Sequence, residues 1–277
     1  MGIGFIYEEL KWPEIKEVVK EDRVVILPTG SIEQHGLHLP VNTDSALVTE
    51  VCRRTAEQIP DEVLLMPTVV YGYDPHHMDF PGNMSIEGVT FLHYVRDIVV
   101  GLAHHGFKRV LIVNGHGSNH IYVDAAARQA IIDTEGKVLC AALSYCNVAR
   151  FAQTAKRIRD SGPGGMSHAC EFETSMYLAM KPELVDMDKA TDWLGAPNIP
   201  DNFKHEIIGL SRPPNRSVIS LVPYWSSISP NGVYGAATKG TKEKGEQLFE
   251  AAAEGLAEII TDLRNYPMPE RIDHHLA

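Results

Sequence analysis

The chain of 277 residues is 44% hydrophobic and 22% charged, with glycine and proline spread along its length. Because we find no linker, low-complexity stretch or internal repeat, we expect residues 1–277 to form a single domain. The formal net charge of −11 argues against nucleic-acid partners and against an anionic membrane surface, since both need a basic patch.

Short apolar runs alternate with longer helical segments through most of the chain. Strands are predicted at Val24–Leu27, Val63–Val70, Arg109–Asn114 and Lys137–Ser144. Helices are predicted at Ser45–Gln58, Glu87–His105, His120–Thr134, Asn147–Asp160, Ala169–Met180 and Thr241–Asn265. Ser85 is the expected N-cap of the second helix and Gly106 its expected C-terminal stop. Strands separated by helices of this length predict an α/β fold with a mostly parallel sheet and helices on both faces. The region from Asp186 to Gly235 has little periodicity and is not assigned.

The N-terminus carries Glu8 and Glu9 and has no apolar segment typical of a secretory signal. No apolar run reaches the ~18 residues that a membrane span requires. The four cysteines have neither CxxC spacing nor the density of a disulfide scaffold. We therefore expect a cytoplasmic protein with reduced thiols and no membrane partner.

The first cluster of ligand-type residues directly follows the strand Val24–Leu27. Glu33 and His35 lie two residues apart, so an extended chain points both side chains the same way, and Asp44 follows shortly after. Open α/β sheets bind ligands at the carboxyl ends of their strands. The segment suits metal chelation, although a solvated carboxylate and histidine explain it equally well when it is taken alone.

The second cluster is NGHGSNH, residues 114–120, which places His116 at the carboxyl end of the strand Arg109–Asn114. Other motifs fit less well. A dinucleotide fingerprint needs a glycine where His120 stands, and HExxH needs a glutamate where Gly117 stands. The segment GAATKGTK has Thr241 where a phosphate-binding loop requires lysine.

The third cluster is GGMSHACEFETS, residues 164–175, in which a glycine turn leads into the predicted helix. His168 and Glu171 are three residues apart and would share a helix face, whereas Glu173 would point elsewhere. Acidic residues at a helix start are also explained by the helix dipole, but the histidine is not explained so easily. We interpret Cys170 as a small buried side chain rather than a nucleophile.

The three clusters together supply carboxylate and imidazole ligands without thiolates. Such a set suits two divalent first-row metal ions bridged by one carboxylate. Two metals about 3.5 Å apart can share a hydroxide and polarise a carbonyl, which is hydrolase chemistry. The expected ligands are Glu33, His35, Asp44, His116 and Glu171.

Four ordered motifs resemble those of the creatininase family of amidohydrolases. They are LPTGSIEQHGLHLPVNTD at 27–44, YG followed by HxxFPG at 71–82, NGHG at 114–117 and SHACEFETS at 167–175. The segment GVYG and the helix that starts near Thr241 fit the same pattern. The resemblance therefore runs from about Val24 to the last helix, and it implies a three-layer α/β sandwich with a parallel core sheet.

The resemblance implies metal binding by Glu33, His35 and His116, with Asp44 as the bridging ligand. Creatininase itself has a glutamate ligand at the position of Ser118 and none at the position of Glu171, whereas many relatives carry the motif HAGE, which HACE matches here. We therefore place the fifth ligand at Glu171.

His168 is implied as the catalytic residue beside the substrate, because imidazole titrates near neutrality. Creatininase has a tryptophan at the position of Gly164, so activity on creatinine is not the first expectation. Relatives also favour other residues at Asp74, and we expect the substrate pocket to include Asp74, His77 and Ser118.

These features predict a metal-dependent amidohydrolase that cleaves a C–N bond of a small amide, cyclic amides included, by means of a metal-bridging hydroxide. Within the same family, a deformylase or a peptidase acting on a small modified peptide is an alternative. A metal-stabilised scaffold without catalysis is a further alternative. The resemblance implies two divalent ions, zinc with manganese or iron as substitutes, and a homo-oligomer such as a hexamer, with a small-molecule amide as substrate.

Overall fold

The computed structural model describes residues 3–195 and 221–275. The strands of its main sheet are β1 (Val24–Thr29), β2 (Val63–Leu65), β3 (Arg109–Asn114) and β4 (Leu139–Ser144). The helices are α1 (Trp12–Val18), α2 (Thr43–Gln58), α3 (Gly88–His104), α4 (His120–Asp133), α5 (Ala149–Ile158), α6 (Glu171–Met180), α7 (Trp225–Ile228) and α8 (Lys242–Asn265). A smaller sheet contains β5 (Met166–His168), β6 (Asp192–Trp193) and β7 (Tyr234–Ala236).

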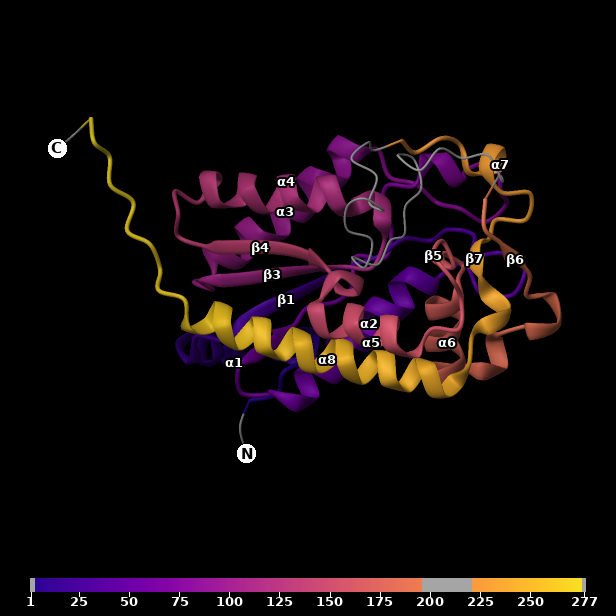
Figure 1. Ribbon diagram of the computed structural model, residues 1–277. Coiled ribbons are helices and arrows are strands. Elements are labelled where there is room, and N and C mark those ends of the chain that lie inside the picture. Colours follow the sequence, from indigo (N-terminus) through magenta and orange to yellow (C-terminus); the bar gives the residue numbers. More distant parts are fainter. Residues whose placement is uncertain (1–2, 196–220, 276–277) are drawn as a thin grey trace.

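The main sheet is parallel throughout, with the strand order β2-β1-β3-β4. Its side chains alternate between two apolar cores. Ile26 and Val113 belong to the core under α2, α5, α6 and α8, whereas Leu27 and Ile112 belong to the core under α1, α3 and α4. Figure 1 shows the resulting three layers, with α3 and α4 on one face of the sheet and α2, α5, α6 and α8 on the other. The predicted three-layer α/β fold is confirmed.

The direction of the chain across the sheet reverses between β1 and β3. From β1 the chain passes through α2 to the edge strand β2, and it then returns past β1 through α3 to β3. A crevice opens at the carboxyl ends of the two strands at such a switch point, because the following segments turn to opposite faces. This geometry positions the candidate site.

The small sheet is antiparallel, with the order β5-β7-β6, and lies at the carboxyl-end side of the main sheet (Figure 1). The sequence did not predict it, because its strands contain only two or three residues each. The unassigned region supplies β6, α7 and most of β7, and its residues 196–220 lie outside the described residues.

Several element boundaries differ from the predictions for local reasons. The strand predicted at Val63–Val70 ends at Leu65, shortly before Pro67, which has no backbone N–H for a sheet ladder. The N-cap of α3 is Glu87 rather than Ser85, because the Glu87 side chain accepts a hydrogen bond from the backbone of Thr90 at 2.7 Å. Gly106 follows that helix with a φ of +98°, as a helix stop requires.

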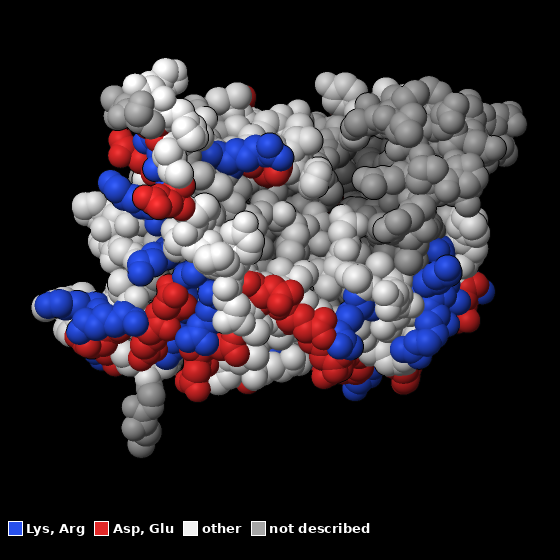
Figure 2. All heavy atoms as spheres, turned by 60° about the vertical axis from the view of Figure 1, so that its left-hand side comes forward, with Lys and Arg blue, Asp and Glu red and all other residues white. Residues whose placement is uncertain are grey.

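Acidic and basic side chains alternate over the face shown in Figure 2, and no continuous basic patch is visible there. Oppositely charged side chains pair between helices, as Arg150 of α5 does with Glu254 and Glu258 of α8. Among the described residues, no helix is long and apolar enough to cross a membrane.

Candidate metal centre

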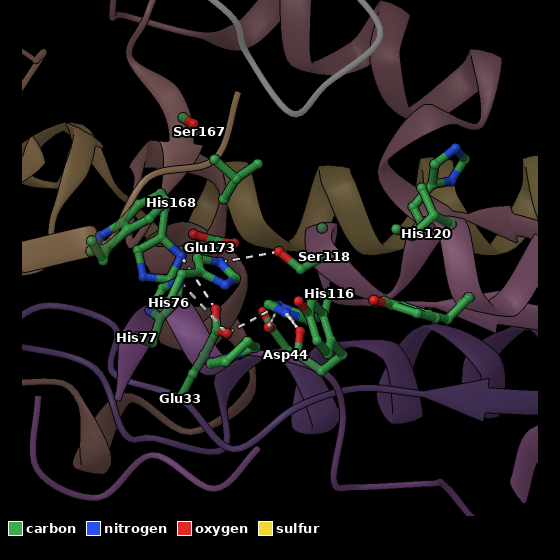
Figure 3. A pocket seen from close by; sticks show the side chains of 17 residues that line it. Glu33, Asp44, His76, His77, His116, Ser118, His120, Ser167, His168 and Glu173 are labelled. Atoms are coloured by element: carbon green, nitrogen blue, oxygen red, sulfur yellow. Dashed lines mark hydrogen bonds and ion pairs between the residues drawn. The ribbon is translucent and has the colours of Figure 1, made fainter. Parts of the chain in front are cut away.

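The loop after β1 carries Glu33 and His35 into the crevice. Ile32 pairs with Met84 in an isolated antiparallel bridge, and the Glu33 backbone N–H donates to the Val41 carbonyl at 2.9 Å, so the segment stays extended. Glu33 and His35 therefore point the same way, as predicted, and both are buried. Figure 3 shows Glu33 directed toward Asp44 and His116.

Asp44 belongs to the first turn of α2, where the helix dipole favours a carboxylate. The Ser31 hydroxyl donates to Asp44 Oδ2 at 2.9 Å. The helix approaches the β1 loop closely because residue 30 is glycine: a Cβ at Gly30 would lie 2.5 Å from the Cα of Ser45. The position of the Asp44 carboxylate is thus fixed by packing of backbone on backbone.

His116 follows β3 and is oriented by its neighbours. The Asn114 amide donates to the His116 carbonyl at 2.6 Å, and the His116 backbone N–H donates to Asn114 Oδ1 at 3.2 Å. The ring nitrogen Nε2 lies 3.1 Å from the carbonyl oxygen of Tyr73, which can only accept a hydrogen bond. Nε2 therefore carries a hydrogen, and Nδ1 faces the carboxylates, which is the arrangement typical of metal-binding histidines.

The two oxygens of Asp44 face different imidazoles. Oδ2 lies 3.0 Å from His116 Nδ1, and Oδ1 lies 3.2 Å from His35 Nε2. Glu33 Oε2 is also close to His116 Nδ1, at 3.1 Å. The ligand atoms thus form two adjacent groups that share one carboxylate, which is the layout of a binuclear centre.

The structure does not bring Glu171 to this cluster. Glu171 accepts hydrogen bonds from the backbone of Asp160 at 2.8 Å and Ser161 at 3.0 Å, and it pairs with Lys244 Nζ at 2.6 Å. The expectation failed because His168 is not helical: it lies in β5, and Ala169 has a φ of +49° before α6 begins at Glu171. A spacing of three residues across that turn does not produce a shared helix face.

Glu173 takes the place expected for Glu171. Two residues further along α6 the side chain points about 200° away around the helix, toward the crevice. Glu173 Oε1 lies 3.8 Å from His35 Nε2, and Glu173 groups with His35 and His168 as a possible set of ligands. Its second oxygen accepts a hydrogen bond from the Cys170 backbone at 3.2 Å, which holds the side chain in place.

The electrostatics of the cluster favour bound cations. Burial raises the pKa of Glu33, and the nearby imidazole of His116 offsets this only in part. Burial disfavours charge on His35 and His116, but the carboxylates around them outweigh this effect and raise the pKa of both imidazoles. Asp44 is likewise buried, yet His35 and His116 hold its pKa well below the usual range.

In the described part of the chain, no lysine or arginine lines the cavity. His35 and His116 are therefore the cationic partners that the buried carboxylates have there. Glu33 Oε2 and His35 Nε2 are buried and have no hydrogen-bond partner among the described residues. Carboxylate and imidazole donors suit zinc, manganese and iron. The residues present therefore fit divalent metal ions.

His168 and His77, which the sequence analysis names as site residues, both line the cavity. His168 Nδ1 lies 3.5 Å from Glu33 Oε1, and His77 Nε2 lies 3.9 Å from Glu33 Oε2. Burial and then the neighbouring histidines lower the pKa of both rings, which favours their uncharged forms. Figure 3 shows the two imidazoles on the same side of the cluster.

The remaining two predicted residues differ in position. Ser118 lines the cavity, and its hydroxyl lies 3.1 Å from His76 Nε2. Asp74 is fully buried but does not line the cavity, and burial together with the charge of Glu33 raises its pKa to about 7.

The cavity beside the cluster has a volume of about 490 Å³. Its wall includes residues that the sequence analysis did not place at the site, namely Tyr73, His76, Tyr122, Glu173, Val222 and Trp225. Trp225 stacks on His77, with ring centroids 4.6 Å apart and an angle of 17° between the planes. Trp225 lies in the unassigned region and had no sequence signal, whereas Glu173 is part of the SHACEFETS motif and was set aside for Glu171.

Comparison with known proteins adds independent information. A family model described as "Creatininase: Creatinine amidohydrolase" matches residues 8–260. A creatinine amidohydrolase from Pseudomonas putida is 32% identical over 266 residues, which cover 92% of this chain and 95% of that protein. A mycofactocin precursor peptide peptidase from Mycobacterium ulcerans is 30% identical, covering 86% of this chain and 82% of that protein. A 3-dehydro-scyllo-inosose hydrolase from Thermotoga maritima is 26% identical, covering 94% of this chain and 84% of that protein.

Solved structures agree with this result. A crystal structure of creatinine amidohydrolase superposes with a TM-score of 0.79 at 30% identity, covering 95% of this chain and 99% of that one. A structure described as "Creatininase Mn" has a TM-score of 0.78 at 30% identity, covering 94% of this chain and 98% of that one. With its parallel sheet, its carboxylate and histidine cluster and a match over nearly its whole length, the chain belongs to the creatininase family of amidohydrolases.

Proposed function

We propose that the protein hydrolyses a C–N bond of a small amide with the help of two divalent metal ions. The observation that carries the proposal is the position of Asp44, whose two oxygens face His116 and His35 at 3.0 and 3.2 Å. One ion would be held by Glu33, Asp44 and His116, and the other by His35, Asp44 and Glu173. Zinc is the first expectation, with manganese or iron as substitutes.

Such ions lower the pKa of water and polarise a carbonyl oxygen. The contribution of the chain is to hold the ligands rigidly and to move protons. Burial lowers the pKa of His168, which favours the uncharged ring, and its Nδ1 lies 3.5 Å from Glu33 Oε1. It would accept a proton at Nδ1 from the attacking water and then return it to the leaving nitrogen, as a general base and acid does.

The cavity supports a substrate that is uncharged or cationic. Its described wall contains three carboxylates and no lysine or arginine, which disfavours an anionic group away from the metals. Its volume of about 490 Å³ suits a small molecule or the end of a short peptide. The names of the relatives include both a creatinine amidohydrolase and a peptide peptidase, so a deformylase or peptidase activity stays an alternative.

An open cavity directly beside the ligands favours catalysis over a metal-stabilised scaffold, because structural metal sites are saturated by protein ligands. Three residues of the cavity wall, His168, His77 and Ser118, are not needed as metal ligands and are free to contact a substrate.

The test is a hydrolysis screen of cyclic amides, formamides and short peptides with protein loaded with zinc, manganese or iron. We expect release of an amine from at least one class, and loss of this activity after chelation and in Asp44→Asn. A variant at an exposed acidic residue, Asp97→Asn, serves as a matched control that keeps its activity. Amine release that continues unchanged in chelated protein or in Asp44→Asn would contradict the proposal.

A further inference from the structure

Gln34 lies between Glu33 and His35, and its side chain contacts two other histidines of the site. It is buried, with 6% of its surface exposed. Its amide nitrogen Nε2 lies 3.2 Å from His77 Nδ1 and 3.1 Å from His168 Nε2.

The orientation of the Gln34 amide is fixed from its other end. The backbone N–H of Gly36 donates to Gln34 Oε1 at 2.9 Å, so the oxygen must face Gly36 and the NH₂ group must face the imidazoles. The Gln34 side chain also packs against Gly232, where an added Cβ would collide with Oε1. The amide therefore has little freedom to turn over.

Three polar atoms of other residues lie within hydrogen-bond distance of the Gln34 amide nitrogen. They are His77 Nδ1, His168 Nε2 and the carbonyl oxygen of Gly232, which lies 3.1 Å from Gln34 Nε2. However, His168 Nε2 also lies 2.8 Å from the backbone carbonyl oxygen of Gln34, which can only accept a hydrogen bond. His168 Nε2 therefore carries a hydrogen and cannot accept one, so the amide donates to His77 Nδ1 and to Gly232.

The two imidazoles consequently present different groups to the cluster. His168 has its hydrogen on Nε2, so the nitrogen that faces Glu33 and the cavity, Nδ1, is unprotonated. His77 accepts at Nδ1, so in the uncharged ring its hydrogen is on Nε2, which lies 3.9 Å from Glu33 Oε2. One ring is ready to accept a proton, and the other is ready to donate a hydrogen bond.

We propose that Gln34 is a positioning residue that holds His77 and His168 in these complementary roles. This inference rests on the proposed amide hydrolysis. When water attacks the amide carbonyl, a C–O bond forms and the proton of the water passes to His168 Nδ1. His77 Nε2–H donates a hydrogen bond to the carbonyl oxygen as that oxygen gains negative charge. The proton then moves to the leaving nitrogen as the C–N bond breaks.

The experiment reads the position of the hydrogens directly, without a substrate. Zinc-loaded protein labelled with ¹⁵N in histidine is studied by long-range ¹H–¹⁵N NMR, and the two rings are assigned with His77→Asn and His168→Asn. We expect Nε2–H on both rings in the unaltered protein. Gln34→Glu keeps the size of the side chain but offers an acceptor in place of the donor, so we expect the hydrogen of His77 to move to Nδ1.

Gln34→Met, which can neither donate nor accept at the amide, provides a second variant. We expect it to leave His77 as a mixture of both forms and to lower kcat about 10- to 100-fold with little change in KM, as loss of a group that orients catalytic side chains does. Gln153→Met, at an exposed position of α5, is the matched control and leaves the His77 and His168 signals unchanged.

Nδ1–H on His77 in the unaltered protein, or an unchanged His77 signal in both Gln34 variants, would overturn the inference. The metal content of each sample is measured alongside. A protein that binds no zinc contradicts the proposed metal-dependent function, whereas a zinc-loaded protein with the wrong tautomers contradicts only the role of Gln34.

Discussion

Asp44 links the two halves of the proposed centre, because each of its oxygens faces a different imidazole. The other ligand-type residues are placed by independent segments: the β1 loop, the β3 loop and α6. A small displacement of any one segment would separate the ligand atoms. Their close approach therefore indicates a site whose geometry is fixed by packing.

At the residue scale, the role of His168 yields the first prediction. His168→Asn removes the group proposed to accept and return a proton, so turnover of the substrate found in the screen should fall about 10²- to 10⁴-fold. Metal content should not change, since His168 is not among the proposed ligands. Steady-state kinetics and elemental analysis measure the two effects, with His93→Asn at an exposed position of α3 as the control. Unchanged turnover would exclude the proton-transfer role.

Trp225 yields a second prediction at this scale. Its ring forms part of the cavity wall and stacks on His77, so it offers a flat apolar surface to a substrate. Trp225→Leu should raise KM for amides that contain a ring about 2- to 12-fold, because an aromatic contact contributes about 0.5–1.5 kcal/mol. Acyclic amides should be less affected. Trp12→Leu, at an exposed residue outside the cavity lining, is the control. An equal rise in KM for cyclic and acyclic amides would contradict the proposed contact between Trp225 and the substrate ring.

At the element scale, a buried ion pair ties the start of α6 to the start of α8. Lys244 Nζ contacts Glu171 at 2.6 Å, Asp160 at 2.7 Å and the Lys239 carbonyl at 2.7 Å. Glu171 is fully buried, whereas Asp160 is largely exposed and its ion pair adds little. The pair holds the chain just before β5, and so it helps to fix the strand that carries His168.

Removing Lys244 should therefore destabilise the protein in a pH-dependent way. Lys244→Met leaves the buried Glu171 carboxylate without its cation and should lower the free energy of unfolding at pH 7 by about 3–5 kcal/mol. Burial opposes ionisation of Glu171, but Lys244 outweighs it and lowers the Glu171 pKa. The stability that this pair contributes is thus present above the ordinary glutamate pKa of about 4.3 and is lost as pH falls through the lower folded-state pKa.

Urea unfolding at pH 7 and near pH 3.5 measures this difference. The difference in free energy of unfolding between the unaltered protein and Lys244→Met should be smaller at the lower pH, because Glu171 becomes protonated. Lys242→Met, two residues earlier on the same helix and exposed, is the matched control. If this difference in free energy of unfolding increases at the lower pH, the ion pair between Lys244 and Glu171 is not the source of the lost stability.

Elements with a strong periodic signal could be predicted from the sequence, and those whose placement depends on tertiary contacts could not. The strand Arg109–Asn114 was predicted to the residue, because an apolar run between polar residues marks a buried parallel strand. The turn at Ala169 gave no such signal, since its positive φ occurs at a residue that seldom adopts it. That single turn decides whether Glu171 or Glu173 faces the crevice.

At the scale of the whole molecule, the predicted homo-oligomer stays a prediction, as do a single domain and a cytoplasmic location. Large apolar side chains are exposed on two loops close to the site, including Leu37, Met78 and Met84. Exposed apolar patches commonly mark contacts between proteins. We therefore expect sedimentation equilibrium to give a multiple of the chain mass of 30.7 kDa, with a hexamer as the first expectation. A mass of one chain at all concentrations would contradict this.

The proposed binuclear centre has Glu173, and not Glu171, as a ligand. The most direct test is elemental analysis of metal per chain in the unaltered protein, in Glu173→Gln and in Glu171→Gln, each purified without chelator and shown to be folded. We expect about two ions per chain in the unaltered protein and in Glu171→Gln, and about one or fewer in Glu173→Gln. Full occupancy in Glu173→Gln, or loss of metal in Glu171→Gln alone, would contradict this expectation.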